Sequence, residues 1–326
     1  MGGDLGPHLI IQASLDCLKE LNAINIILVG PAVLIEKVIR QYPHSIDHNR
    51  LEIQPASETI GLTEPLSKIL RNKPNASMRI ALELVQKKIA DACISAGNSG
   101  ALMALSRMLL KTVPGVERPA MITSIPTNEG CCQLLDLGAN VDCSAEQLYQ
   151  FAVMGSLSAE AQGIKTPRIA LLNIGTESTK GNQLVKLTAT LLEQSSNLNY
   201  IGFIEANGLY QGNADVVVCD GFVGNVFIKS SEALAKILDS KINYFVNRNI
   251  FTRFFGGFIF PGLTTYKNKL SPCYYNGANL IGLQGIVVKS HGAAGRESFR
   301  SAIYKTQREI QMCLPLCLSE RIEDFL

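Results

Sequence analysis

Short apolar segments alternate with longer segments of helical spacing along most of the chain. Apolar runs such as NIILVG (25–30), RIALLNIG (168–175) and DVVVCDG (215–221) are each followed by a stretch whose hydrophobic residues recur three and four positions apart. This alternation predicts strands joined by amphipathic helices, and therefore a mainly parallel sheet covered on both faces. No polar low-complexity linker interrupts the pattern. We therefore expect residues 1–326 to form a single three-layer α/β/α domain, although two lobes sharing a cleft would fit the same pattern.

Local signals predict where several of these elements begin. Pro7 stands at the first turn of a predicted helix, and Ser77 is a candidate N-cap for the helix MRIALELVQKKI. The sequence from Ser144 to Gln147 has the spacing of a capping box and predicts a helix that continues to about Ala161. The apolar runs AMITSIP and CCQLLDLG predict two neighbouring strands that can pair in antiparallel fashion.

One segment, 244–277, breaks the alternation. It is rich in phenylalanine with interspersed Arg and Lys, and its Gly-Gly and Pro-Gly pairs interrupt helices. Short amphipathic pieces of this composition suit a membrane surface or a groove on a partner protein. We expect a protruding amphipathic segment; a dimer interface or a core-packing hairpin fits the same spacing.

Composition narrows the classes of protein. The 326 residues are 47% hydrophobic and 18% charged, with a net charge of +2, which argues against disorder and against a nucleic-acid-binding footprint. No apolar run is long enough to span a membrane, and we expect no secretory signal. The nine Cys form no C-x-x-C pair, so we expect reduced, buried thiols in a cytosolic protein; the four His are too dispersed to predict a metal site.

Four predicted strands end in small polar turns, at 96–100, 173–182, 220–225 and 290–295. Glycine permits a close approach of the backbone to a ligand, and the helix that follows each turn offers free N–H groups to an anion. Lys180 and His291 lie within two of these turns. A single turn of this kind can be purely structural, but four together predict a phosphate site at the carboxyl ends of the strands. None of them matches a P-loop or a standard dinucleotide motif.

At these turns the sequence resembles a known family. The stretches MGGDLGP, SAGNSGALMA, LLDLGANVDC, QFAVMG, LLNIGTESTKGN, ADVVVCDGFVGNVFIK and GIVVKSHGAAG resemble the PlsX family of phosphate acyltransferases over nearly the whole chain. In that family a short strand precedes the Met-Gly-Gly-Asp motif with which this chain begins. Either the start of this sequence is misassigned, or this form lacks the family's first strand. Segment 244–277 is also more aromatic than the resemblance leads us to expect.

The resemblance implies an enzyme that makes acyl phosphate from acyl-(acyl carrier protein) and inorganic phosphate, without a metal or an organic cofactor. It implies a fold similar to those of phosphotransacetylases and isopropylmalate-type dehydrogenases. It also implies a cytoplasmic homodimer that associates peripherally with the membrane. The product would pass to a membrane-bound glycerol-3-phosphate acyltransferase in phospholipid synthesis. Acyl carrier protein, phosphate and the membrane surface are thus the expected partners, and nucleic acid is not.

Such a reaction needs positioned reactants and a stabilised oxyanion rather than a protein nucleophile. We expect Lys180, Asn182, Asn225 and His291 to act in catalysis. We expect phosphate to bind at Gly97, Asn98, Ser99, Gly100 and Gly292. Residues expected to fix turns and orient Lys180 or His291 are Asp4, Asp136, Asn140 and Asp220.

Simpler interpretations of the same residues stay open. Lys180 would also fit a solvated loop, and His291, Asn98 and Asn225 would fit helix or strand caps. Cys219 lies inside a strand and is predicted to be inert. For the whole protein, the other candidates are a phosphotransacetylase-like enzyme that uses acyl-CoA, and an inactive, truncated homologue that associates with membranes. A metal-dependent dehydrogenase would need a compact Asp cluster, which the sequence does not show.

Overall fold

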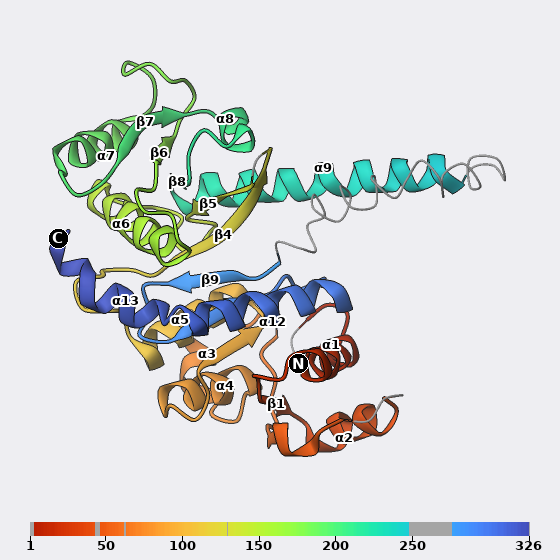
Figure 1. The fold of residues 1–326 in the computed structure, drawn as a ribbon. Coiled ribbons are helices and arrows are strands. Elements are labelled where there is room, and N and C mark those ends of the chain that lie inside the picture. Colours follow the sequence, from red (N-terminus) through yellow and green to blue (C-terminus); the bar gives the residue numbers. More distant parts are fainter. Residues whose placement is uncertain (1–2, 43–45, 62, 129, 248–275, 326) are drawn as a thin grey trace.

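The computed structural model describes residues 3–42, 46–61, 63–128, 130–247 and 276–325, and its centre is an eight-stranded sheet (Figure 1). In spatial order the strands are β3 (Ala92–Ser95), β10 (Ile286–Lys289), β9 (Ala278–Ile281), β4 (Ala120–Thr127), β5 (Gly130–Leu135), β8 (Val216–Val218), β6 (Ile169–Leu172) and β7 (Tyr200–Ile204). Strands β1 (Ile26–Gly30) and β2 (Leu51–Pro55) form a separate parallel pair. The predicted antiparallel neighbours are β4 and β5, which confirms that pairing.

Strand direction reverses within the large sheet. Among its described strands, β3 pairs in parallel with β10, and β5, β8, β6 and β7 pair in parallel with one another in that order. The three pairings between these groups, β10 with β9, β9 with β4 and β4 with β5, are antiparallel. Consequently β3 and β10 run opposite to β8 and β6. The carboxyl ends of the two groups therefore leave the sheet at opposite edges.

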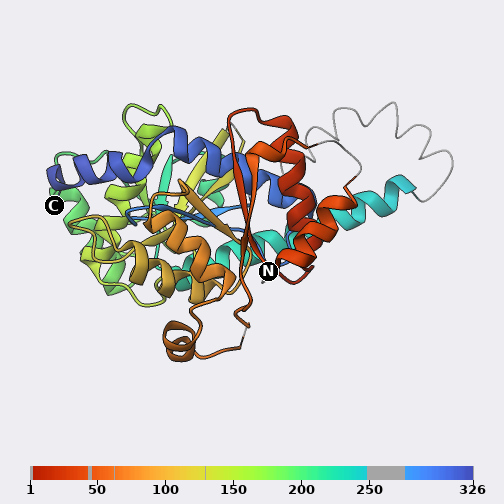
Figure 2. The same cartoon turned by 90° about the horizontal axis from the view of Figure 1, so that it is seen from below.

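Helices cover both faces of the sheet and confirm the three-layer architecture (Figure 2). On one face lie α1 (Pro7–Glu20), α6 (Ala145–Ala161), α7 (Gln183–Gln194), α12 (Arg296–Gln311) and α13 (Leu314–Arg321). On the other lie α3 (Leu66–Asn72), α4 (Ser77–Gln86), α5 (Ser99–Leu110), α8 (Ala206–Gln211) and the start of α9 (Gly221–Asn247). Helix α2 (Ala32–Arg40) connects β1 to β2.

The side chains of β8 show how this layering arises from alternation along a strand. Val216 and Val218 pack with α6 and α13, whereas Val217 packs on the opposite face with α8 and α9. All three valines are fully buried. A strand that is buried on both faces has a continuous apolar sequence, which is the pattern found here.

Two of the predicted helix starts have different outcomes. The capping box at Ser144 is present, and α6 ends at Ala161 as expected. The prediction that Ser77 caps α4 is wrong, because Ser77 is the first helical residue and Ala76 occupies the cap position without a side-chain hydrogen bond. The start is instead held by the Ser77 N–H, which donates to the Glu58 carbonyl at 3.0 Å.

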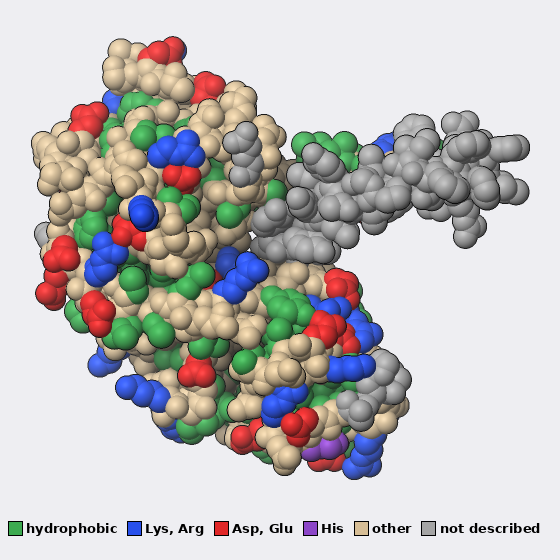
Figure 3. Space-filling model, viewed as in Figure 1, with side chains coloured by type: hydrophobic (Ala, Val, Ile, Leu, Met, Phe, Trp, Pro, Cys, Tyr) green, Lys and Arg blue, Asp and Glu red, His purple; other side chains and the backbone are tan. Residues whose placement is uncertain are grey.

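Helix α9 follows β8 almost directly and is 27 residues long. It starts at Gly221, where the Val223 N–H donates to Oδ1 of Asp220 at 2.8 Å, and it reaches Asn247. Its distal half projects from the body of the molecule (Figures 1 and 3). Of the predicted segment 244–277, residues 244–247 end this helix and 276–277 precede β9, while 248–275 lie outside the described residues. Within the described ranges, no helix is both long and apolar enough to cross a membrane.

The cysteines do not all follow the expectation of burial. Cys17, Cys93, Cys132 and Cys219 are buried, but Cys131 and Cys313 are exposed. Cys131 lies near the start of β5 in the β4–β5 hairpin, and Cys313 directly precedes α13. At both positions the side chain lies outside the core.

Candidate active site

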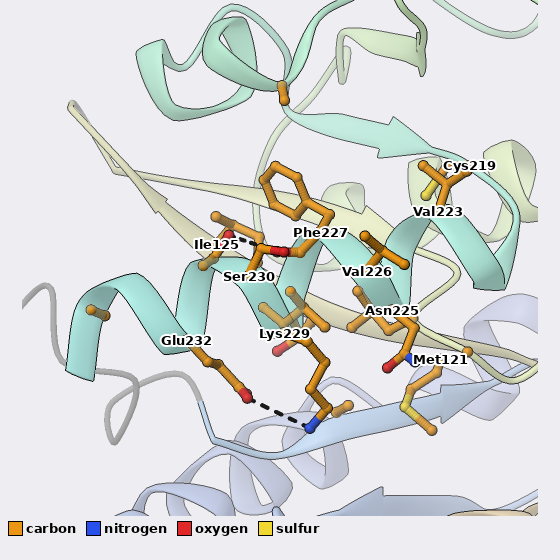
Figure 4. Close-up of a pocket in the computed structure, with 18 of the residues that line it drawn as sticks. Met121, Ile125, Cys219, Val223, Asn225, Val226, Phe227, Lys229, Ser230 and Glu232 are labelled. Atoms are coloured by element: carbon orange, nitrogen blue, oxygen red, sulfur yellow. Dashed lines mark hydrogen bonds and ion pairs between the residues drawn. The ribbon is translucent and has the colours of Figure 1, made fainter. Parts of the chain in front are cut away.

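A cavity of about 1900 Å³ lies between α9, the central strands and the loops that follow them (Figure 4). It is lined by residues from each of the four polar turns, among them Ser99, Asn182, Asp220, Asn225 and His291. These turns leave opposite edges of the sheet. They share one cavity because α9 starts after β8 and extends to the loop after β10. The expected convergence therefore depends on a helix that crosses the sheet, and not on a shared carboxyl edge.

The turns after β3 and β10 form one side of the cavity. These strands are parallel neighbours, and the Ser290 N–H donates to the Ser95 carbonyl at 2.9 Å. The Asp4 N–H donates to the Gly292 carbonyl at 2.8 Å. A β-carbon on Gly292 would lie 2.9 Å from a carboxylate oxygen of Asp4, so the Asp4 side chain lies directly against this turn. The N-terminal segment thus holds the β10 turn from outside.

The expected phosphate cradle at 97–100 is partly occupied by internal hydrogen bonds. Asn98 is the N-cap of α5, and its Oδ1 accepts the Ala101 N–H at 3.0 Å. The Gly97 N–H already donates to the Ser95 hydroxyl at 3.2 Å. Ser99 lines the cavity at the first position of α5. The N–H groups of Ser99 and Gly100 stand at the N-terminus of a twelve-residue helix.

His291 is held by Asn276, a residue that the sequence analysis missed. Oδ1 of Asn276 accepts the His291 N–H at 2.9 Å, while its Nδ2 donates to the Ser290 hydroxyl at 2.7 Å and to the Ser298 carbonyl at 2.8 Å. The imidazole Nδ1 of His291 accepts the Ala293 N–H at 3.1 Å. Asn276 is the second-to-last residue of segment 244–277, which has no clear strand or helix pattern, so no local signal marked it.

Lys229 and Glu232, both on α9, approach the imidazole of His291. Nζ of Lys229 lies 3.2 Å from Nε2 of His291, and Oε2 of Glu232 lies 3.6 Å from Nζ of Lys229 and 3.5 Å from Nε2 of His291. Asn225, Lys229 and Glu232 are spaced four and three residues apart, which places them on one helix face. Figure 4 shows Asn225 and Lys229 projecting from the same side of α9. That spacing was the signal in the sequence that could have found Lys229.

Lys289 adds a second lysine to this wall of the cavity. Burial and, to a lesser extent, the nearby charge of Lys229 together lower the pKa of Lys289 to about 8, while Asp4 opposes the shift. Burial raises the pKa of Glu232, but the nearby His291 and the charges of Lys229 and Lys236 outweigh it, so its pKa is below the usual value. The carboxylate of Glu232 is therefore ionised at neutral pH.

The loop after β5 forms the opposite side of the cavity around Asp136, which is fully buried. Its carboxylate accepts the N–H groups of Met121 at 2.8 Å, Ala139 at 3.1 Å and Asn140 at 2.6 Å, as well as Nδ2 of Asn140 at 2.9 Å. Burial raises the pKa of Asp136, and these hydrogen bonds oppose the rise. The Asn140 carbonyl in turn accepts the Gly221 N–H at 2.8 Å, which ties this loop to the start of α9.

Asn225 lies against this loop, on the second turn of α9. A β-carbon on Gly138 would stand 3.3 Å from the β-carbon of Asn225, and Gly138 has a φ of +115°. Both residues line the cavity. Asn225 does not cap the helix, because Asp220 occupies that position.

The loop after β6 brings in Asn182 but leaves Lys180 outside the cavity wall. Asn182 caps α7 through its Oδ1, which accepts the Val185 N–H at 2.9 Å, and it lines the cavity together with Gly181. Lys180 is exposed, and its aliphatic stem packs over Gly175. The structure thus brings Asn182, Asn225 and His291 to the cavity, whereas Lys180 is not among its lining residues.

The rest of the cavity wall is largely apolar and includes Met121, Ile125, Leu137, Val226 and Phe227. Cys219 also lines it, but burial raises the pKa of its thiol well above the usual value. A thiol without access to its thiolate form is a poor nucleophile. The cavity therefore offers polar groups on two sides and an apolar floor between them.

Comparison with solved structures identifies the class of fold. The EutD phosphotransacetylase from Staphylococcus aureus superimposes with a TM-score of 0.60 at 17% identity, covering 93% of this chain and 92% of that one. A phosphotransacetylase from Streptococcus pyogenes gives 0.60 at 15% identity, covering 94% of this chain and 91% of that one. These similarities show a phosphotransacetylase-like α/β fold, and at such identities they show the fold alone.

Sequence comparison then identifies the family. The model of the family described as "Fatty acid synthesis protein" matches residues 1–314. The phosphate acyltransferase of Ectopseudomonas mendocina (strain ymp) is 55% identical over 326 residues, covering all of this chain and 97% of the relative. That of Pseudomonas putida (strain F1) is 56% identical with the same coverage. The chain belongs to the PlsX family of phosphate acyltransferases and is an acyltransferase.

Proposed function

We propose that this enzyme transfers the acyl group of acyl-(acyl carrier protein) to inorganic phosphate. An oxygen of phosphate attacks the thioester carbonyl, the carbon–sulfur bond breaks, and the proton of hydrogen phosphate ends on the departing thiolate. The reaction thus yields acyl phosphate and the free carrier thiol. The observation that carries this proposal is the cavity itself, in which an apolar floor lies between polar groups from four strand ends.

The described side chains suit this chemistry without a covalent intermediate. We propose that phosphate binds at Ser99, Gly100, His291 and Gly292, where the turns after β3 and β10 lie side by side. Asn225, from the opposite wall, would donate its amide to the developing oxyanion. Asn182 would contribute to the same wall, and Lys180 would add positive charge from the loop that precedes it. Asp4, Asp136, Asn140 and Asp220 would hold these loops in place.

The size of the cavity supports a long acyl chain. Ligand pockets are ordinarily about 300–1,000 Å³, whereas this cavity measures about 1900 Å³. The wall between the polar groups consists of side chains such as Met121, Ile125 and Phe227. An acetyl group would leave most of that apolar surface in contact with water, and a long chain would cover it. This favours a long-chain donor over acetyl-CoA.

The test is release of the carrier thiol from palmitoyl-(acyl carrier protein) with and without phosphate. We expect release that depends on phosphate and that is much slower with acetyl-CoA as donor. Faster release from an acyl-CoA than from the carrier-bound thioester would instead assign the enzyme to the CoA-dependent class. Binding to liposomes without any phosphate-dependent turnover would indicate a membrane-associated homologue without activity.

We further propose that the enzyme acts as a homodimer in the cytoplasm, at the membrane surface, where its product would enter phospholipid synthesis through a membrane-bound glycerol-3-phosphate acyltransferase. In support, α9 exposes large apolar side chains along its length, including Leu234 at 58%, Ile237 at 57% and Tyr244 at 62%. Such a surface requires a cover. Replacing Leu234 with Glu should lower the molar mass measured by light scattering towards that of a monomer, and an unchanged mass would place the dimer contact elsewhere.

A further inference from the structure

The contact between Lys229 and His291 contains more donors than acceptors. Three polar atoms form a triangle at the end of β10: Nζ of Lys229, Nε2 of His291 and Oε2 of Glu232, with separations of 3.2, 3.5 and 3.6 Å. The shortest side joins Lys229 to His291. The two residues come from different elements, α9 and the loop before α12. A carboxylate is the only acceptor among the three if the imidazole carries its proton on Nε2.

The hydrogen bond at the other ring nitrogen fixes that proton. Nδ1 of His291 accepts the Ala293 N–H at 3.1 Å, so Nδ1 carries no hydrogen. A neutral imidazole with an accepting Nδ1 has its proton on Nε2. Nε2 therefore faces Lys229 as a donor, and the ammonium of Lys229 is a donor as well. Glu232 is shared between them, at distances longer than a good hydrogen bond.

An anionic oxygen between Nζ of Lys229 and Nε2 of His291 would satisfy both donors. The neighbouring wall of the cavity supplies further donors of the same kind. Ser99 begins α5 beside this turn, since β3 and β10 are adjacent and parallel, and Lys289 lines the same cavity. Ser99 and Lys289 therefore add donor groups to the wall of the cavity that also holds Lys229 and His291. A compact, multiply charged anion can accept hydrogen bonds from several of these donors at once, which the carboxylate of Glu232 does not do.

We propose that Lys229 is a further substrate-binding residue, which binds inorganic phosphate together with His291. This proposal rests on the proposed function, because it assigns one of the two reactants of that reaction. Lys229 also lies one helical turn from Asn225 on the same face of α9. Helix α9 would thereby place Lys229, which binds phosphate, one turn away from Asn225, which donates to the oxyanion. The reacting carbon would lie between these two side chains.

The kinetic test separates the two substrates. Lys229→Ala should raise the phosphate KM by about tenfold or more, as expected for a lost hydrogen bond to a charged group, and should leave the KM for acyl-(acyl carrier protein) unchanged. Lys229→Arg keeps the charge and should recover part of the loss. Lys241→Ala, an exposed lysine further along α9 that does not line the cavity, is the matched control and should behave as wild type. A change in the carrier KM alone, or no change in either KM, would overturn the proposal.

A binding measurement keeps the inference distinct from the proposed reaction. Phosphate should raise the Tm of the wild-type protein and of Lys241→Ala more than chloride does at equal ionic strength, and Lys229→Ala should lose most of that difference. The Lys229 side chain is 56% exposed, so its replacement leaves the core intact. If the enzyme shows no turnover but Lys229→Ala still loses the phosphate effect, the site stands while the proposed function fails. If Lys229→Ala keeps the full effect, the proposal fails.

Discussion

Gly224 of α9 lies directly against the backbone of Asp136: a β-carbon on Gly224 would come within 1.9 Å of the Asp136 carbonyl oxygen. The contact joins the second turn of α9 to the end of β5. It also sets the position of the next residue, Asn225, over the loop that Asp136 organises. The DG–GN pattern that follows the VVV strand in the sequence is thus a requirement for close packing.

Gly224→Ala should therefore destabilise the protein strongly. The added methyl group cannot fit without a shift of α9 or of the β5 backbone, and overpacking of this kind costs about 3 kcal/mol or more. Thermal unfolding should show a Tm lower by several degrees. The matched control is Gly100→Ala in α5, where the nearest atoms to an added β-carbon are 3.4 and 4.0 Å away. That variant should be as stable as wild type or slightly more stable.

Asn225→Ala should lower kcat without unfolding the protein. Loss of one amide donor to an oxyanion typically reduces kcat by about a hundredfold. Asn225 is an exposed residue of α9, so its truncation leaves Gly138 and Asp136 in place. Steady-state kinetics with unchanged circular dichroism is the measurement. Wild-type turnover in this variant would contradict the assignment of Asn225.

Lys180→Ala provides the corresponding test on the opposite loop. If Lys180 supplies charge to the reactants, as proposed, turnover should fall while the Tm stays the same, because the side chain is exposed. Full activity would instead support the interpretation of Lys180 as a solvated loop residue. In that case Lys229 and Lys289 would be the lysines that supply positive charge to the reactants.

The phosphate KM should rise as the pH rises through about 8. Burial and the neighbouring Lys229 lower the pKa of Lys289 to about 8, against the opposing charge of Asp4, so Lys289 loses its positive charge in this range. Glu232 and His291 line the same cavity as Lys289. Free phosphate is already a dianion there, so the change would come from the enzyme. Lys289→Met should have a higher phosphate KM that no longer rises in this window; an equal rise in the variant would assign the effect to another group.

Glu309 should make stability depend on pH. It lies on the inner side of α12, 8% exposed, and burial raises its pKa to about 7, with Lys305 opposing. A carboxyl whose pKa is higher in the folded than in the unfolded state stabilises fully below the unfolded value, and the contribution is lost as the pH rises through about 7. The Tm of Glu309→Gln relative to wild type should therefore increase between about pH 5 and about pH 8. Exposed Glu320→Gln is the control, and a Tm difference for Glu309→Gln that is constant across this range would contradict the account.

Local features of the fold could be predicted from the sequence, and long-range ones could not. The capping box at Ser144 and the alternation of Val216, Val217 and Val218 depend on neighbours within a few residues, and both predictions hold. Strand β9 was not predicted, because its four residues carry no turn or alternation signal that sets them apart. The reversal of strand direction that β9 and β4 introduce depends on pairing between distant segments.

The same limit applies to the site. Asn182, Asn225 and His291 stand beside glycine-rich turns and could be found by inspection. Lys229 and Glu232 lie inside a helix, where their spacing from Asn225 places them on one face, but their approach to His291 follows only from the crossing of α9 to the end of β10. Asn276 acts through three hydrogen bonds to residues 14 to 22 positions later, which no local pattern reveals.

The most direct test of the account is to trap the product. Hydroxylamine added to a reaction of palmitoyl-(acyl carrier protein), phosphate and enzyme converts an acyl phosphate to the hydroxamate, which can be quantified against the free thiol. We predict equal amounts of hydroxamate and thiol, both dependent on phosphate. Thiol released together with free fatty acid, and no hydroxamate above the enzyme-free control, would show transfer to water instead of phosphate and would contradict the central claim.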